Sequence, residues 1–409
     1  MPQHNDGAAH RHSADALSRA VAGYRAEQFL FASPRSTLLT RGVARRVSQG
    51  PEALRERIAQ AFDAADTAGD QTRPAETKPL LIGAVPFDTT HPAQLSVTCE
   101  YLQGGPVHGH LPEVSKPHAP LLRAQTTPWP TPRDFEASVE QALGQLRQGP
   151  LSKVVLARTL RLQFDHDLDV SALLATLLRK HPQAYTYAVP VTRAQDQEAS
   201  VFVGATPELL VRREGVRVFL NPLAGSVARR HDPIEDAAVA QALMRSDKDL
   251  REHAVVIDAI AQVLRPLCKS LHVPEAPSVI CTDALWHLST FIEGELIDPS
   301  LTSLDLALAL HPTPAVCGHP LSVARAAIAG LEPFDRSLFA GFVGWMDAAG
   351  DGEWAVALRC ADCATRSATL YAGAGIVAGS NPQAERLETQ TKFRTMLSAM
   401  GVDQAIAAS

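Results

Sequence analysis

The chain has 409 residues, of which 45% are hydrophobic, and it carries a formal net charge of −6. This composition allows a large buried core, either in one unit or in several domains. The chain has no basic stripe for nucleic acid and no run of about 18 apolar residues to span a membrane. Because the first twenty residues are polar and lack an apolar segment, they do not resemble a secretory signal, and we expect a cytoplasmic protein.

Residues 1–20 are expected to be disordered, since the segment begins polar and His-rich and shows no periodicity. Amphipathic periodicity predicts the helices 50–66, 134–149, 232–246, 247–267 and one that begins at Pro382. Residues 104–133 are rich in Pro and Gly and are expected to be an irregular connection. Apolar runs predict the strands 80–88, 153–162, 184–191, 200–205, 208–213, 216–223, 338–347, 353–360 and 368–377. Groups of strands separated by helices indicate the α+β class with large, mainly antiparallel sheets.

The six cysteines are scattered, and only Cys360 and Cys363 have the spacing of a metal or redox motif. A single CxxC without a second pair of ligands is a weak signal. We therefore interpret both as ordinary buried or turn cysteines.

The C-terminal helix turns charged residues toward its apolar side. At 100° per residue, Glu385, Glu388 and Lys392 fall within 60° of one another, next to Met396 and Phe393. A face of solvent-exposed ion pairs would instead lie on the polar side of the helix.

The helix 247–267 shows the same feature more clearly, because Glu252 lies in the middle of an apolar stripe with Val256 and Val263, and Asp249 lies beside it. A buried carboxylate is costly unless it is paired or bound to a metal. Oxygen ligands in this pattern suit a hard cation, Mg²⁺ first. Buried Glu–Arg pairs remain an equally good interpretation of the helical geometry alone.

Lys153 shares a strand face with Val155 and Ala157. A lysine removed from water loses its proton more readily and can act as a base. The residues alone favour a lysine at the first position of a strand that extends its ammonium to solvent. Glu208 follows a Thr-Pro turn between strands and is either part of the turn or an acid held at a strand end.

Taken together, these segments resemble the chorismate-utilising enzymes, and specifically the isochorismate synthases of siderophore pathways. The resemblance runs over nearly the whole chain from about residue 28. The matching segments are "FLFASPRSTLLTRG", "GAVPFD", "LSKVVLAR", "VGATPELL", "PLAGSVARR", "DKDLREH", "WHLST", "LHPTPAVCGHP", "EPFDRSLFAGFVGW", "LRC" and "AGAGIVAGSNPQAERLETQTK".

The resemblance implies one chorismate-binding catalytic domain over residues 21–405, with two large sheets packed together and helices outside. It also implies a magnesium-dependent conversion of chorismate to isochorismate by water addition at C2 and loss of the C4 hydroxyl. By resemblance, Lys153 is the general base, Glu208 the general acid, Glu252 and Glu388 the Mg²⁺ ligands, and Asp249 and Glu385 acidic neighbours that hold metal-bound water. The substrate-binding residues implied in the same way are Gly225, Ser226, His287, Ala315, Phe339, Arg359, Gly373, Gly375 and Lys392.

Other members of this family are the main alternatives. Lys153 argues against anthranilate-type enzymes, and Ala224 argues against the aminodeoxychorismate type, which has a nucleophilic lysine there. Salicylate synthases, which go on to eliminate pyruvate from isochorismate, are the closest rival. They commonly have Thr and Tyr where this chain has Ala315 and Phe339, so we expect the enolpyruvyl group to be kept. A non-catalytic sensor of aromatic acids is the alternative from another class.

The expected partner is a small molecule, chorismate, with no nucleic acid and no membrane. We expect a monomer that makes transient contact with the next enzyme of its pathway. The sequence does not distinguish a siderophore, menaquinone or salicylate pathway.

Overall fold

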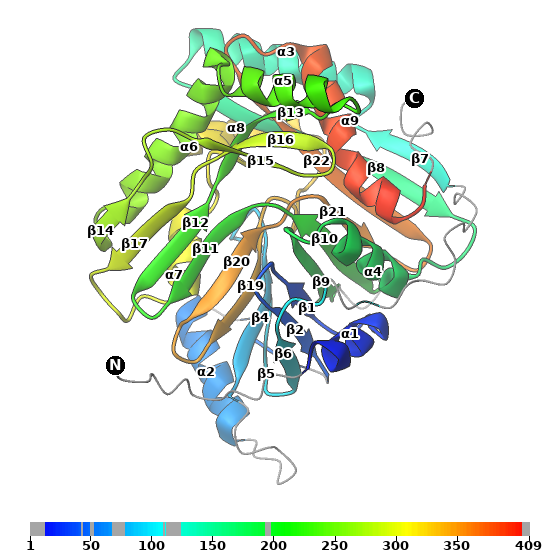
Figure 1. The fold of residues 1–409 in the computed structure, drawn as a ribbon, viewed down its shortest axis with the longest axis vertical. Coiled ribbons are helices and arrows are strands. Elements are labelled where there is room, and N and C mark those ends of the chain that lie inside the picture. Colours follow the sequence, from blue (N-terminus) through cyan, green and yellow to red (C-terminus); the bar gives the residue numbers. More distant parts are fainter. Residues whose placement is uncertain are drawn as a thin grey trace.

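The computed structural model describes residues 13–41, 44–49, 53–67, 78–108, 111, 124–192 and 198–402. Helices and strands alternate in groups along the chain, and the strands form three sheets (Figure 1). The helices are α1 (Ala14–Ala22), α2 (Leu54–Thr67), α3 (Pro132–Gln148), α4 (Val170–Lys180), α5 (Pro233–Leu243), α6 (Asp247–Leu264), α7 (Ser303–Leu310), α8 (Leu321–Leu331) and α9 (Pro382–Ala399).

The largest sheet of the described residues has ten strands, which pair in antiparallel fashion. β7 (Ala124–Trp129) pairs with β8 beside the main path. In spatial order the main path is β18 (Gly318–His319), β8 (Lys153–Phe164), β22 (Ser367–Val377), β21 (Cys360–Cys363), β10 (Ser200–Thr206), β9 (Tyr185–Val191), β1 (Leu30–Ala32), β2 (Thr37–Thr40) and β6 (Tyr101–Gly104).

A second sheet has nine strands and is also antiparallel. Its order is β14 (Cys268–His272), β17 (Ile292–Leu296), β12 (Arg217–Asn221), β11 (Leu209–Glu214), β20 (Gly352–Val356), β19 (Phe342–Asp347), β4 (Leu80–Val85), β5 (Gln94–Thr98) and β3 (Arg45–Arg46).

The two large sheets share one apolar core. Phe31 and Tyr187 of the ten-stranded sheet belong to the same buried cluster as Leu81, Val211 and Trp354 of the nine-stranded sheet. Burial of these side chains from both sheets stabilises their face-to-face packing. The predicted fold class, α+β with two large antiparallel sheets packed together and outer helices, is confirmed.

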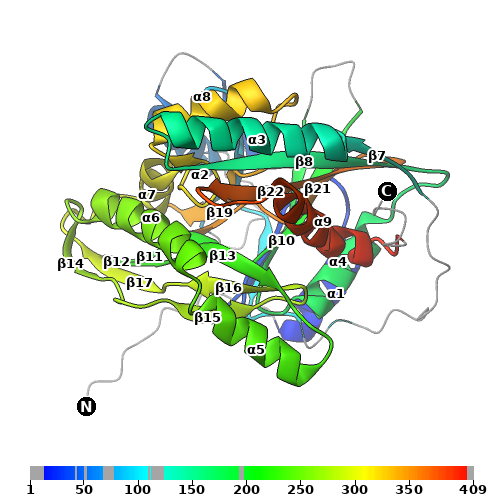
Figure 2. The ribbon, with the colours of Figure 1, turned by 90° about the horizontal axis from the view of Figure 1, so that it is seen from above.

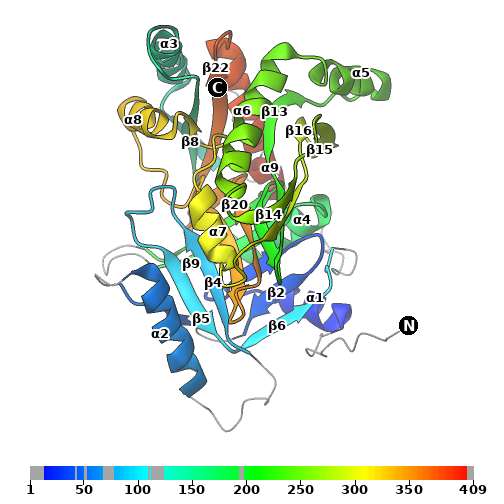
Figure 3. The same cartoon turned by 90° about the vertical axis from the view of Figure 1, so that its left-hand side faces the viewer.

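A third, small sheet consists of β13 (Leu223–Ala228), β16 (Leu285–Ser289) and β15 (Ser278–Cys281). α6 packs against β13, and Figure 3 shows these two elements on one side of β8 and β22, with α3 and α8 on the other. Viewed from above, α3 lies along β8 (Figure 2). The small sheet therefore faces β8 and β22, which lie near one end of the ten-stranded sheet.

β22 alternates strictly between buried and half-buried residues. Ala374 and Ile376 are buried in the core, while Gly373 and Gly375 point to the opposite face, as the two-residue period of a strand requires. Two glycines on one face remove side chains from the surface that β22 presents to the small sheet. This arrangement leaves room for a cavity.

The N-terminal prediction is wrong for part of its range. Residues 1–12 lie outside the described residues, but 14–20 belong to α1, whose Leu17 and Val21 are fully buried. Ser13 caps the helix by accepting a hydrogen bond from the Ala16 N–H. The expected irregular connection 104–133 also contains β7, which pairs with β8. Within the described ranges, none of the helices combines the length and apolar character needed to cross a membrane.

Candidate active site

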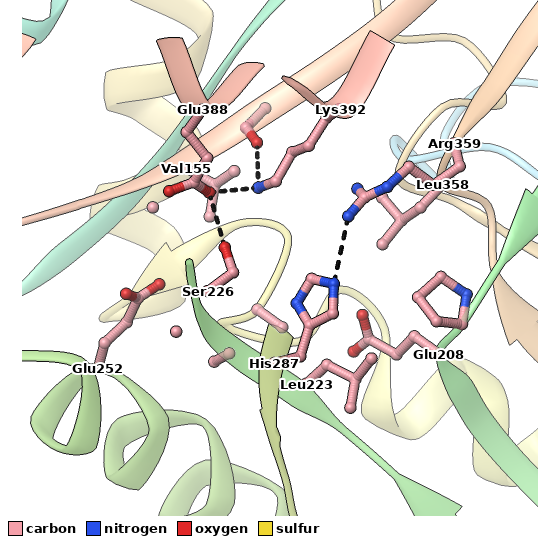
Figure 4. Close-up of a pocket in the computed structure, with 16 residues that line it drawn as sticks. Val155, Glu208, Leu223, Ser226, Glu252, His287, Leu358, Arg359, Glu388 and Lys392 are labelled. Carbon is pink, nitrogen blue, oxygen red and sulfur yellow. Dashed lines mark hydrogen bonds and ion pairs between the residues drawn. The ribbon is translucent and has the colours of Figure 1, made fainter. Parts of the chain in front are cut away.

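One cavity lies where β8 and β22 face the small sheet, between α6 and α9 (Figure 4). It holds about 530 Å³ of empty space, counting the part open to solvent. Eleven of the fifteen predicted site residues line it. The lining is Val155, Pro207, Glu208, Leu223, Ala224, Gly225, Ser226, Glu252, His287, Ala315, Leu358, Arg359, Gly373, Gly375, Glu388 and Lys392.

Lys153 lies directly behind this lining and is buried, with a relative exposure of 1%. Its Nζ is 2.9 Å from Glu252 Oε1. The contact is an ion pair without hydrogen-bond geometry, because Nζ has no hydrogen-bond partner among the described residues. The interpretation of Lys153 as a solvent-exposed lysine at a strand end is therefore wrong. A buried cation with unused N–H donors faces the cavity wall instead.

α6 and α9 carry the carboxylates, and both helices are capped as their sequences indicate. Ser246 accepts from the Asp249 N–H at the start of α6. Asn381 accepts from the Ala384 N–H at the start of α9, where Pro382 takes the first helical position. The caps fix both helix starts, about two turns before Glu252 and Glu388, the carboxylates that line the cavity.

Glu388 interacts with both a cation and a hydroxyl. Lys392 Nζ lies 2.6 Å from its Oε1, and Ser226 Oγ donates to the same oxygen at 3.2 Å. Burial alone would raise the pKa of Glu388, but the charge of Lys392 and these hydrogen bonds outweigh it and lower the pKa. Lys392 also donates to the Gly373 carbonyl at 2.7 Å, which links α9 to β22.

Asp249 and Glu385 lie outside the lining, next to the same acidic group. Ser246 Oγ donates to Asp249, and Lys248 Nζ lies 3.1 Å from Glu385 Oε1. Burial raises the pKa of both carboxyls, and the charge of Glu388 raises them further. Like charges therefore meet at this end of the cavity.

This donor set fits a hard divalent cation. Asp249, Glu252, Glu385 and Glu388 offer only oxygen ligands, and their mutual repulsion is what a bound cation relieves. As the side chains stand, each contacts a lysine or a serine, and no three acidic, His or Cys side chains among the described residues lie close enough together to hold a metal. The alternative of buried Glu–Arg pairs is wrong for the three glutamates, since the cations that contact them are lysines.

Glu208 lies at the opposite end of the cavity from Glu252 and Glu388 (Figure 4). It is buried, and burial raises its pKa to about 7, although the Leu223 N–H and the charges of Lys153 and Arg359 act the other way. A carboxyl with this pKa keeps its proton below about pH 7 and loses it above. The interpretation of Glu208 as only a turn residue is not supported, because its side chain lines the cavity.

Arg359 and His287 lie beside Glu208. Burial lowers the pKa of Arg359 to about 10, so the guanidinium stays charged. Burial, helped by the charges of Arg359 and Lys392, holds the pKa of His287 well below its usual value, so the ring is neutral. Arg359 Nη2 therefore donates to His287 Nε2, over 3.5 Å. This end of the cavity presents a cation and a protonated acid.

The two positions that we associated with product fate are placed differently. Ala315 lines the cavity, but Phe339 does not. Phe339 is buried and stacks on Tyr371, with ring centroids 5.3 Å apart. The structure therefore does not bring Phe339 into the lining of the cavity. Sequence reasoning also missed His253, which is buried behind the cavity and bonds Ala224 and Thr290. The signal was available, because His253 lies 100° from Glu252 at the edge of the apolar stripe of α6.

Comparison with known proteins identifies the family of the chain. The family model described as chorismate binding enzyme matches residues 109–401. The isochorismate synthase DhbC of Bacillus subtilis is 47% identical over 386 residues, covering 93% of this chain and 95% of that protein. The vibriobactin-specific isochorismate synthase of Vibrio cholerae is 37% identical over 377 residues, covering 92% of each chain.

A solved structure shows the same fold. The putative 2,3-dihydroxybenzoate-specific isochorismate synthase DhbC from Bacillus anthracis superposes with a TM-score of 0.86 at 41% identity, covering 95% of this chain and 100% of that one. Its match and those of the relatives span both large sheets and the cavity. The chain belongs to the isochorismate synthase group of the chorismate-binding enzyme family.

Proposed function

We propose that this chain isomerises chorismate to isochorismate. The observation that carries the proposal is one cavity with a buried lysine behind one wall and a protonated glutamic acid at the other end. Water addition at C2 requires a base, and departure of the C4 hydroxyl requires an acid. Lys153 and Glu208 supply these two functions on different sides of the bound ring.

Chorismate is a dianion, and the cavity offers donors to two carboxylates. Arg359 is charged and buried, so its fork suits one of them, which we assign to the enolpyruvyl carboxylate. The space for the ring carboxylate is bordered by the N–H groups of Gly225 and Ser226, by the glycines of β22 and by Lys392. Glycine lets a ligand approach the backbone closely.

In the proposed reaction, Lys153 accepts a proton from water as the water oxygen forms its bond to C2. The two ring double bonds shift, and the C4–O bond breaks. Glu208 gives its proton to the departing hydroxyl, which leaves as water. One proton is taken up and one is given back, so the sum of the reaction is an isomerisation.

The acidic residues of α6 and α9 would hold Mg²⁺, with Glu252 and Glu388 as ligands and Asp249 and Glu385 behind them. A bound Mg²⁺ supplies Lewis-acid stabilisation of the ring carboxylate as electron density moves. Lys153 and Lys392 lie against the Glu252 and Glu388 oxygens that would bind the cation.

The names of two relatives refer to vibriobactin and 2,3-dihydroxybenzoate, so we propose that the product feeds a siderophore pathway by way of 2,3-dihydroxybenzoate or salicylate. Within this proposal the chain acts in the cytoplasm as a monomer, with transient contact to the next enzyme. One catalytic unit comprises residues 21–405 together with α1, because Leu17 of α1 is buried in the core.

The test is product identity. Purified protein is incubated with chorismate and Mg²⁺, and the products are separated by chromatography and compared with authentic isochorismate. A coupled lactate dehydrogenase assay reports pyruvate in the same mixture. We expect isochorismate without stoichiometric pyruvate. Unchanged chorismate would support the non-catalytic binding protein, and equal amounts of salicylate and pyruvate would support the salicylate synthase.

A further inference from the structure

The strand that carries Gly225 and Ser226 has an irregularity at this point. Leu223 faces Ser289 of β16 and Ser226 faces His287, so two residues of β13, Ala224 and Gly225, lie opposite one residue of β16. This is a β-bulge, which redirects side chains and leaves part of the ladder unpaired. The bulge turns Ala224, Gly225 and Ser226 toward the cavity, where all three form part of the lining.

A bulge with a buried carbonyl needs a hydrogen-bond donor from outside the sheet. His253 of α6 provides it, with Nδ1 3.1 Å from the Ala224 carbonyl oxygen. Since a carbonyl only accepts, Nδ1 carries the hydrogen, and Nε2 of the neutral ring accepts from Thr290 Oγ1 at 2.7 Å. His253 and Thr290 are both buried, so neither bond competes with bulk water.

A second contact fixes the same bulge one helical turn earlier. Gly225 has φ +78°, a backbone conformation that favours glycine. An added Cβ would lie 3.0 Å from Asp249 Cβ, so the Gly225 backbone rests directly on α6. Asp249 and His253 therefore support the bulge from one helix, and Glu252, between them in sequence, lines the cavity.

We infer that His253 is a positioning residue for this active site: through its bond to the Ala224 carbonyl it holds the β13 bulge that presents the Gly225 backbone and the Ser226 hydroxyl to the cavity. Ser226 Oγ in turn donates to Glu388 Oε1 at 3.2 Å. His253 does not line the cavity. It acts through the backbone. The part of the inference that concerns turnover rests on the proposed function.

The test separates the two bonds of the imidazole. His253→Leu removes both at similar volume, His253→Asn places an amide N–H where Nδ1 stood, and Thr290→Val removes only the partner of Nε2. Gln28→Leu is the matched control, because Gln28 is a buried side chain that donates to the Thr40 carbonyl at 2.7 Å, away from the cavity. Thermal melts confirm that assays are run where each variant is folded.

We expect His253→Leu to lower kcat/KM for chorismate by about 10²-fold, the size of effect that a small misplacement in an active site produces. His253→Asn should recover most of this loss, Thr290→Val should lose less than about tenfold, and Gln28→Leu should melt earlier with normal kcat/KM. If His253 acts through the bulge, adding Ser226→Ala to His253→Leu should cost less than the product of the two single losses.

Hydrogen exchange of the peptide that spans 223–228 provides a readout independent of turnover, and it should speed up in His253→Leu but not in Gln28→Leu. Normal kcat/KM in His253→Leu, or an Asn variant that is folded but not rescued, would overturn the inference. If His253→Leu does not fold, the same test is made with Thr290→Val and His253→Asn. The inference would then be overturned by normal exchange and turnover in Thr290→Val together with a His253→Asn variant that is folded but inactive. A wild-type protein that is inactive on chorismate would sink the proposed function, while the exchange result would still decide whether His253 holds the bulge.

Discussion

Lys153 and Glu252 meet at 2.9 Å in the space that Gly375 leaves open on β22. A Cβ at Gly375 would overlap Glu252 Oε1 and would lie 3.3 Å from Lys153 Cε. The base, a metal ligand and a glycine of the proposed site are thus one packing unit. This unit explains why the sequence places a glycine opposite Val155 in the middle of a buried strand pair.

Gly375→Ala should therefore reduce activity without unfolding the protein. The overlap is with the far end of a flexible glutamate, so Glu252 moves and the backbone stays. We expect kcat to fall by at least about tenfold, since displacement of about 1 Å in a site has effects of this size or larger. Gly144→Ala is the control, because Gly144 lies in α3 with nothing within 4 Å of its added Cβ. It should retain full activity and gain up to about 1 kcal/mol in the free energy of unfolding.

Activity should fall as the pH rises above about 7, the value to which burial raises the pKa of Glu208. In the proposed reaction Glu208 gives a proton to the departing hydroxyl, so the competent free enzyme carries that proton on Glu208 and loses it as the pH rises through this pKa. The measurement is kcat/KM from about pH 5.5 to about pH 9.

Glu208→Gln is the control for this assignment. It should lower kcat by about 10²–10⁴-fold, the usual size of a general acid–base effect, and the fall in rate above about pH 7 should vanish from the residual activity. Lys153→Ala should lower kcat by a similar factor. A fall above about pH 7 that survives in Glu208→Gln, or a wild-type rate that does not fall as the pH rises through 7, would contradict the role of Glu208.

Removal of Mg²⁺ by EDTA should abolish turnover, and Glu388→Gln should lower kcat by more than about 10²-fold by removing a ligand charge. Glu136→Gln is the matched control, because Glu136 also pairs with a cation of α9, Arg386, at 2.6 Å but lies outside the cavity lining. It should change kcat less than about twofold, as a partly exposed pair is worth little. Wild-type turnover in excess EDTA would refute the metal proposal.

Much of this site could be predicted from the sequence because helical and strand periods fix the direction of a side chain. The placement of Glu252 on the apolar side of α6 needed only the 100° step, and the structure has Glu252 buried while Arg251 and Asp258 are exposed. The glycine pair of β22 follows the two-residue period in the same way.

What the sequence could not supply was pairing between distant segments. The lysine partners of Glu252 and Glu385 come from β8 and from the start of α6, and no local period relates them. The β13 bulge depends on its register with β16, which lies some 60 residues later in the chain. The role of the Ala224 carbonyl could therefore not be predicted from the sequence. The packing of Phe339 on Tyr371 was missed for the same reason, and a resemblance that matches positions does not show which way a side chain points.

The last prediction concerns product fate, and the structure sharpens it. Isochorismate loses pyruvate when the C2 hydrogen reaches the enolpyruvyl methylene, which requires the side chain to be held over the ring. Ala315 lines the cavity and lacks a hydroxyl to direct that pose, so Ala315→Thr should raise the pyruvate fraction more than it raises total turnover.

Phe339 lies outside the lining and stacks on Tyr371 at an interplanar angle of 16°. Phe339→Tyr should therefore leave the pyruvate fraction at its wild-type trace level. The double variant should match Ala315→Thr alone, because only one of the two new hydroxyls reaches the substrate. Pyruvate is followed with lactate dehydrogenase and isochorismate by chromatography, at equal chorismate consumption. An increase in Phe339→Tyr equal to that in Ala315→Thr would show that the Tyr371 stack opens during turnover. Stoichiometric pyruvate from the wild-type protein would replace the proposed function by that of a salicylate synthase.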